Sequence, residues 1–146
     1  MNIGELLEKQ SQRYSDKVFL YFENEKVTYQ NFNLTVNRVA NSLRKMGIQK
    51  GKRVAMMLPN SPEFLYAWMG INKIGAVEVP MNIGFTEVEV KYILQHSEAS
   101  AVVIHQDYYP ILQKIKRGDG KAVEKAIGNH FRKALEDLKK ELVQKI

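Results

Sequence analysis

Three short apolar runs alternate with two amphipathic segments between residues 53 and 105, and this alternation limits the fold more than any other feature. The run at 53–58 is almost continuously apolar, as expected for a strand buried on both faces of a parallel sheet. The runs at 76–80 and 100–105 have strand-like composition. Strands and helices that alternate at these lengths favour βαβ units. We therefore predict an α/β fold in which helices flank a parallel sheet.

Helix start and stop signals mark the two amphipathic segments. Ser61 and Pro62 follow the first run, as a capping residue and a first-turn proline do at a helix start. Gly75 stands where the same helix would end. Thr86 and Glu89 form a capping pair ahead of the second segment. Each strand is thus followed by a helix with a defined beginning.

The N-terminal part predicts a helix, a hairpin and a second helix. Residues 3–14 have amphipathic spacing, while residues 17–22 and 26–29 are typical of two strands joined by a turn at Asn24–Glu25. Thr28 precedes a long helical pattern that Gly47 ends. Its apolar positions recur at intervals of three and four residues: Phe32, Val36, Val39, Ala40, Leu43 and Met46.

The last part of the chain has a different pattern. We predict a helix over residues 108–116, a turn at 117–120 and one long amphipathic helix over residues 121–146. The apolar stripe of that helix must be covered, because an isolated amphipathic helix is marginal in water. Four of its residues are candidates for a helix interface: Phe131, Leu135, Leu138 and Leu142. We therefore divide the chain into residues 1–116 and a C-terminal extension, 117–146.

Four segments, in this order and spacing, resemble the first core motifs of the acyl-CoA synthetases, the AMP-forming ligases that make acyl-adenylates. They are Val-Thr-Tyr-Gln-Asn-Phe at 27–32, Asn-Arg-Val-Ala-Asn-Ser-Leu at 37–43, the stretch 51–61, and Asn-Lys-Ile-Gly-Ala-Val-Glu-Val-Pro at 72–80. The resemblance identifies residues 1–116 as the N-terminal subdomain of such an enzyme. Beyond residue 116 we recognise no motif of the family.

The resemblance implies a ligase that uses ATP, Mg²⁺ and CoA, but the motifs that handle them follow the matched stretch in this family. Such enzymes need a Gly/Ser/Thr-rich phosphate loop with a lysine, an acidic residue for Mg²⁺, an aspartate for the ribose, and a lysine that activates the carboxylate. None of these motifs follows His105. We expect this chain to have no catalytic, cofactor-binding or metal-binding residue and not to catalyse the reaction alone.

Several apolar residues are candidates for an acyl pocket in the intact enzyme or for a core or subunit interface in this chain: Tyr66, Trp68, Met69, Met81 and Phe85. His96 and His105 lie nine positions apart without a third ligand nearby. We therefore predict no metal site and interpret His96 as a residue at a helix end, where its partial positive charge is favourable.

Three functional hypotheses remain open. The first is a catalytically incomplete, synthetase-like subdomain whose C-terminal helix covers its exposed surface. The second is a half-enzyme that associates with a separate catalytic remainder and then ligates a fatty acid to CoA through an acyl-adenylate. The third is a non-enzymatic interaction module that dimerises through the long helix.

Composition excludes some alternatives. The chain has no cysteine, so it contains neither a disulfide nor a thiolate metal site. The net charge is +6, but acidic residues interrupt the basic C-terminal segment, so we expect no nucleic-acid partner. No signal peptide is recognisable at the start, and no apolar stretch approaches the roughly 20 residues of a membrane span. A cytoplasmic protein is therefore expected.

Overall fold

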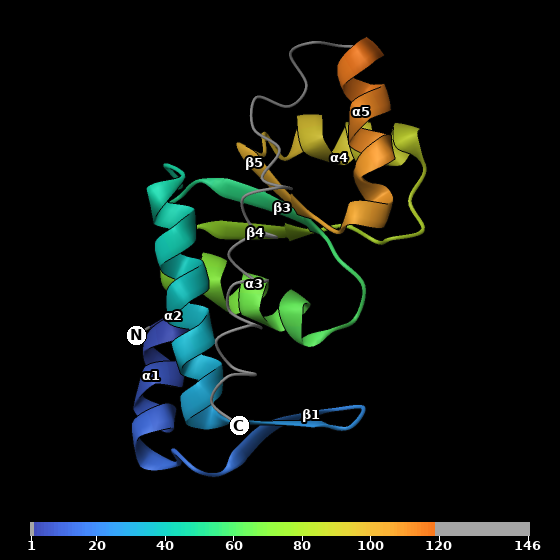
Figure 1. Ribbon diagram of the computed structural model, residues 1–146. Coiled ribbons are helices and arrows are strands. Elements are labelled where there is room, and N and C mark those ends of the chain that lie inside the picture. Colours follow the sequence, from blue (N-terminus) through green and yellow to red (C-terminus); the bar gives the residue numbers. More distant parts are fainter. Residues whose placement is uncertain (1, 119–146) are drawn as a thin grey trace.

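The computed structural model describes residues 2–118. Its centre is a three-stranded parallel sheet in the order β4–β3–β5, formed by Val77–Pro80, Arg53–Met57 and Ala101–Ile104. Val54 of β3 aligns with Glu78 of β4 and with Ala101 of β5. The predicted parallel sheet is therefore present (Figure 1). The long C-terminal helix of the prediction lies outside the described residues.

The helices form one layer on each side of this sheet. Figure 1 shows α2 (Tyr29–Lys45) and α3 (Pro62–Lys73) on one face and α4 (Glu87–His96) and α5 (Tyr109–Gly118) on the other. The first helix, α1 (Ile3–Arg13), packs on α2 and α3. Between β5 and α5 lies a short 3₁₀ turn, Gln106–Tyr108. The architecture is helix, sheet, helix.

Alternate residues of β3 enter two separate hydrophobic cores. Val54 and Met56 join the core formed with α1, α2 and α3, whereas Ala55 and Met57 join the core formed with α4 and α5. All four side chains are fully buried. The continuous apolar run in the sequence is thus explained, because successive side chains of a strand point to opposite faces and here both faces are covered.

The predicted helix signals are confirmed. Thr28, Ser61 and Thr86 accept hydrogen bonds from the backbone N–H three residues ahead, and Thr86 and Glu89 form a reciprocal capping box. Gly47 and Gly75 have positive φ angles, of 86° and 75°. Both glycines follow the end of a helix, where the left-handed conformation stops the chain from continuing as a helix.

The N-terminal hairpin is confirmed as β1 (Val18–Phe22) paired antiparallel with β2 (Glu25–Thr28). Its turn is formed by Glu23 and Asn24 rather than by Asn24–Glu25, so the prediction was one residue too late. Glu23 has a φ of 50°, a conformation that an L-residue seldom adopts, so composition did not indicate it as a turn residue. Phe19 anchors the hairpin, its ring centroid 4.2 Å from that of Phe32 on α2.

The turn predicted at 117–120 is wrong in its first half. Arg117 and Gly118 belong to α5, which therefore extends beyond the boundary that we predicted at residue 116. Gly118 misled the prediction because glycine is typical of turns, whereas here it is the last residue assigned to α5.

Helices α2 and α3 make the most extensive helix contact of the described fold, and Gly70 makes their close approach possible. A Cβ atom at Gly70 would lie 2.5 Å from Cγ1 of Val39 and 3.3 Å from the backbone nitrogen of Ala40. A side chain at position 70 therefore cannot be added unless the Val39 side chain or the backbone of α2 shifts.

We predict that Gly70→Ala lowers the free energy of unfolding by about 1–2 kcal/mol, because overpacking outweighs the roughly 1 kcal/mol gain in helix propensity. Urea titration would measure this. Val39→Ala removes the clashing methyl group, so in that background Gly70→Ala should be neutral or stabilising. Equal effects in both backgrounds would show that the contact with Val39 does not limit the packing.

Tyr66 on α3 extends the aromatic contact, with its ring centroid 5.1 Å from that of Phe32. Burial raises the pKa of Tyr66 to about 12, and the negative charges of Glu63 and Glu25 act in the same direction. The folded state thus favours the neutral phenol. Its stabilising effect is complete below pH 10 and is lost as the pH rises to about 12.

We predict that the stability difference between the wild type and Tyr66→Phe falls between pH 10 and pH 12, by at most about 3 kcal/mol at roughly 1.4 kcal/mol per pKa unit. Urea titrations at several pH values would test this. Tyr21→Phe is the matched control, because Tyr21 is 67% exposed. A difference that stays constant for Tyr66→Phe would contradict the inferred cost of burying the phenolate.

Candidate functional site

The first candidate site is the end of the parallel sheet at which the strands finish, here called the carboxyl edge. The chain leaves β3 for α3 on one face of the sheet and leaves β4 for α4 on the other face (Figure 1). Open α/β sheets bind ligands at such a switch point, where neighbouring connections diverge. The segments that follow the strands here are 58–61, 81–86 and 105–108.

The backbone holds these segments against the strand ends. The Met81 N–H donates to the Met56 carbonyl at 2.7 Å, and the His105 N–H donates to the Met57 carbonyl at 3.0 Å. The Asn82 side chain accepts a hydrogen bond from the Gly84 N–H at 2.8 Å. The segments therefore start from defined positions on the sheet.

The helix N-termini at this edge are already capped by side chains of the chain itself. Ser61 Oγ accepts from the Phe64 N–H at 3.3 Å, and the carboxylate of Glu89 accepts from the Thr86 N–H at 2.7 Å. Hydrogen bonds from the backbone and side chain of Thr86 lower the pKa of Glu89. The positive ends of these helices are therefore partly neutralised by Glu63, Glu87 and Glu89.

His105 and Asp107 form the polar group after β5. His105 Nδ1 accepts from the Asp107 N–H at 3.3 Å and lies 3.4 Å from the Asp107 carboxylate. His105 thus caps the 3₁₀ turn that follows it. This contact accounts for the residue structurally.

The segments at the carboxyl edge contain no lysine or arginine. A nucleotide triphosphate needs cationic side chains or a glycine-rich nest at its phosphates. Within residues 2–118 no group of three His, Asp or Glu residues is arranged to hold a metal ion. The described residues of this edge therefore do not fit ATP·Mg²⁺.

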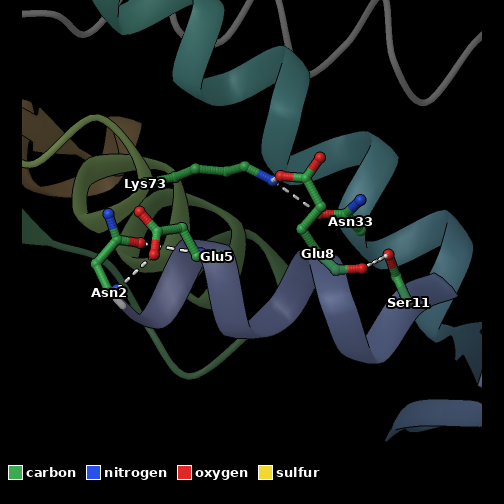
Figure 2. Close-up of polar contacts among 6 residues, drawn as sticks. All are labelled: Asn2, Glu5, Glu8, Ser11, Asn33 and Lys73. Atoms are coloured by element: carbon green, nitrogen blue, oxygen red, sulfur yellow. Dashed lines mark hydrogen bonds and ion pairs between the residues drawn. The ribbon is translucent and has the colours of Figure 1, made fainter. Parts of the chain in front are cut away.

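A polar groove between α1, α2 and α3 is the second candidate site. It has a volume of about 400 Å³, and four of its lining residues are labelled in Figure 2: Asn2, Glu5, Glu8 and Lys73. Its lining includes three carboxamides, two carboxylates and two cationic side chains: Asn2, Glu5, Glu8, Asn37, Ala40, Asn41, Arg44 and Lys73.

Lys73 is the most buried cation of this groove, with a side chain 15% exposed. Its Nζ donates to Asn33 Oδ1 at 2.9 Å and lies 3.4 Å from the Glu8 carboxylate (Figure 2). A Cβ at Gly4 would lie 2.8 Å from the Lys73 Cα, so α1 closely approaches the end of α3. Lys73, at the end of α3, thus connects α3 to α2 through Asn33 and to α1 through Glu8. The Glu8 carboxylate compensates its charge.

Sequence reasoning missed the groove because α1, α2 and α3 bring its residues together from distant positions. One local signal was readable: Asn2 and Glu5 form a capping box at the start of α1. Nothing in the sequence indicated that Lys73 and Glu8 would meet, since they lie on different helices.

Glu78 is a second residue that the sequence did not indicate. It points from β4 toward the core formed with α1, α2 and α3. Its Oε2 is buried there without a hydrogen-bond partner in the described part of the chain. Burial raises the pKa of Glu78, and a hydrogen bond from the Trp68 side chain acts in the opposite direction.

The predicted acyl-pocket or interface residues fall into two groups on opposite faces of the sheet. Tyr66, Trp68 and Met69 belong to the core with α1, α2 and α3, whereas Met81 and Phe85 belong to the core with α4 and α5. The structure therefore does not bring the five residues together. A role for them in an acyl pocket or interface stays a prediction.

The predicted helix-interface residues lie outside the described part of the chain: Phe131, Leu135, Leu138 and Leu142. His96 does end α4, as predicted, and its ring stacks on that of Tyr92 at 5.4 Å. No helix in residues 2–118 is long and apolar enough to cross a membrane.

Comparison with known proteins connects this fold to a family. A profile of the AMP-binding enzyme family matches residues 7–145, which includes most of the segment in which the sequence analysis recognised no motif. The crotonobetaine/carnitine–CoA ligase of Salmonella paratyphi A is 37% identical over 123 residues, which are 81% of this chain and 24% of the ligase.

Solved structures give the same result. A fatty acyl-CoA synthetase of Mycobacterium tuberculosis superposes with a TM-score of 0.83 and 31% identity, over 92% of this chain and 28% of the synthetase. The N-terminal domain of FACL13 from the same organism superposes with a TM-score of 0.82 and 31% identity, over 93% of this chain and 36% of that domain.

The chain spans about a quarter of the length of the curated relatives that it matches. The relatives and structural neighbours are acyl-CoA ligases, and this chain corresponds to the N-terminal part of them. The resemblance found in the sequence is confirmed, and the chain belongs to the AMP-binding enzyme family.

Proposed function

We propose that this chain forms the N-terminal structural part of a ligase that joins a carboxylic acid to CoA with the use of ATP. The observation that carries the proposal is the family match over residues 7–145 together with the absence of cationic side chains from the carboxyl-edge segments at 58–61, 81–86 and 105–108. The first supports the reaction type. The second supports a structural role for these segments, with the groups that bind ATP supplied by other residues.

The reaction has two steps in such a ligase. A carboxylate oxygen attacks the α-phosphorus of ATP, which gives an acyl-adenylate and releases pyrophosphate. The CoA thiol then attacks the acyl carbon, which gives the thioester and releases AMP after the thiol proton is lost. The described residues do not supply the groups for either step. They provide a structural framework in which α3 and α4 are capped and begin directly after the segments that follow β3 and β4.

We propose a fatty acid as the substrate class. The fatty acyl-CoA synthetase of Mycobacterium tuberculosis supports this choice, whereas the Salmonella relatives are named for crotonobetaine and carnitine. Met81 and Phe85, at the carboxyl edge, are the described apolar residues that we expect nearest to an acyl chain. The reaction would take place in the cytoplasm, where ATP and CoA are available.

Association with a separately supplied catalytic part is the alternative. It is favoured by the open sides of the sheet, since β4 and β5 each have a strand neighbour on one side only within the described residues. A free strand edge offers backbone groups for pairing with another chain. Self-association through residues 121–146 is a further alternative, which rests on the sequence pattern alone.

We predict that a chimera remains an active ligase when this chain replaces the corresponding quarter of the Salmonella crotonobetaine/carnitine–CoA ligase. Thioester formation would be followed by loss of free CoA thiol. A matched chimera that also carries Gly70→Val should lose activity, because the added side chain disrupts the contact between α2 and α3. A well-folded chimera without activity would contradict the structural equivalence.

The isolated chain should give no heat on titration with ATP·Mg²⁺ and no pyrophosphate from ATP and a fatty acid. Addition of the separately expressed remainder of the Salmonella ligase distinguishes the two hypotheses. Recovery of activity on mixing supports the half-enzyme hypothesis. Activity only in the covalent chimera supports the hypothesis that these residues act as the N-terminal part of a single ligase chain. Saturable binding of ATP to the isolated chain would overturn the scaffold role.

A further inference from the structure

A basic cluster lies at the amino edge of the parallel sheet, opposite the candidate site at the carboxyl edge. Residues 44–53 contain five basic residues and no Asp or Glu. All five are exposed: Arg44, Lys45, Lys50, Lys52 and Arg53. We call these five residues the amino-edge basic ridge.

The backbone fixes the ridge to the sheet. The Gly51 N–H donates to the Gly75 carbonyl at 2.8 Å, and the Val77 N–H donates to the Lys52 carbonyl at 2.8 Å. The Lys50 side chain crosses Gly75, since a Cβ there would lie 3.0 Å from the Lys50 Cγ. The three-residue stretch from Lys50 to Lys52 is thus held beside β4 at two points.

Figure 1 shows where this edge lies. The chain leaves the end of α2 and enters β3 at the left of the molecule, on the side from which the strands start. Residues 44 and 45 belong to the last turn of α2, and residue 53 begins β3. The ridge therefore follows the start of the sheet and does not reach the strand ends.

Local contacts explain only part of this charge. Arg53 pairs with Glu98 at 2.8 Å, and both side chains are exposed. Arg44 and Lys45 are favourable at the C-terminal end of α2, and Arg44 also lines the groove that contains Glu5 and Glu8. Within residues 2–118 no ion pair or hydrogen bond joins the side chains of Lys50 and Lys52 to a carboxylate.

The form of the ridge favours an extended anionic surface over a single bound phosphate. Three of its five cations are lysines, which act as hydrated point charges on flexible stems and do not form a rigid fork. Val77, which is 50% exposed, lies beside Arg53 in the strand register. Residues 44–53 contain no aromatic side chain on which a nucleic-acid base could stack.

We propose that the amino-edge basic ridge docks this protein onto a membrane surface rich in anionic lipid headgroups. Clusters of four to eight Lys and Arg residues are typical of segments that bind such surfaces, and the attraction falls off within a Debye length. This inference does not depend on the proposed function. It places the lipid surface at the edge of the sheet opposite the strand ends, so membrane docking and the site at the carboxyl edge do not compete.

The test is sedimentation of the full chain with vesicles of phosphatidylglycerol and phosphatidylcholine, compared with vesicles of phosphatidylcholine alone. We expect binding to the anionic vesicles only, and weaker binding at high salt. Lys50→Gln together with Lys52→Gln should weaken vesicle binding about 25-fold, at about fivefold for each lysine. The matched control is Lys26→Gln with Lys114→Gln, which removes the same charge from exposed positions elsewhere and should weaken binding less than about twofold.

Circular dichroism should show that both double variants keep the fold, since all four lysines are exposed. Equal losses in the two variants would overturn the proposal, because binding would then depend on total charge. No binding to anionic vesicles would also overturn it. A single-stranded oligonucleotide that binds more tightly than the vesicles at the same salt, with loss in the ridge variant, would assign the ridge to nucleic acid instead.

Discussion

The burial of β3 on both faces is the constraint on which the rest of the fold depends. Its side chains enter one core with α1, α2 and α3 and another with α4 and α5, so neither helical layer can be removed without exposing the strand. β3 also provides the backbone pairing for both β4 and β5. The two cores therefore meet along a single strand, and a change that displaces β3 would affect both.

Elements with strong local signals could be predicted from the sequence. The central strand could, because an almost continuous apolar run needs two covered faces. Helices α3 and α4 could, because Ser61 and Thr86 make hydrogen bonds that depend only on residues three positions ahead. The prediction failed at Glu23, which has a left-handed conformation that L-residues seldom adopt, and at Gly118, which belongs to α5 although glycine is a poor helix former.

The candidate sites could not be predicted in the same way, because tertiary contacts create them. Lys73 meets Glu8 and Asn33 only because Gly4 and Gly70 let the three helices approach closely. The residues selected for a common acyl pocket are separated because α3 covers one face of the sheet, whereas the segment after β4 packs against the other face. The sequence places Tyr66 and Phe85 in apolar segments but does not specify the face.

The charges of the two sheet edges differ, and this difference bears on where the chemistry of the family can lie. At the carboxyl edge, Glu63, Glu87, Glu89 and Asp107 occupy the first turns of helices, and the adjoining segments lack lysine and arginine. Such an edge repels a triphosphate more than it attracts one, because exposed like charges within a Debye length of about 10 Å oppose its approach. ATP would therefore have to be held by residues outside 2–118, against a support that contributes shape and packing. The five cationic side chains of residues 44–53 lie instead at the amino edge, where an attraction for anions cannot interfere with the strand ends.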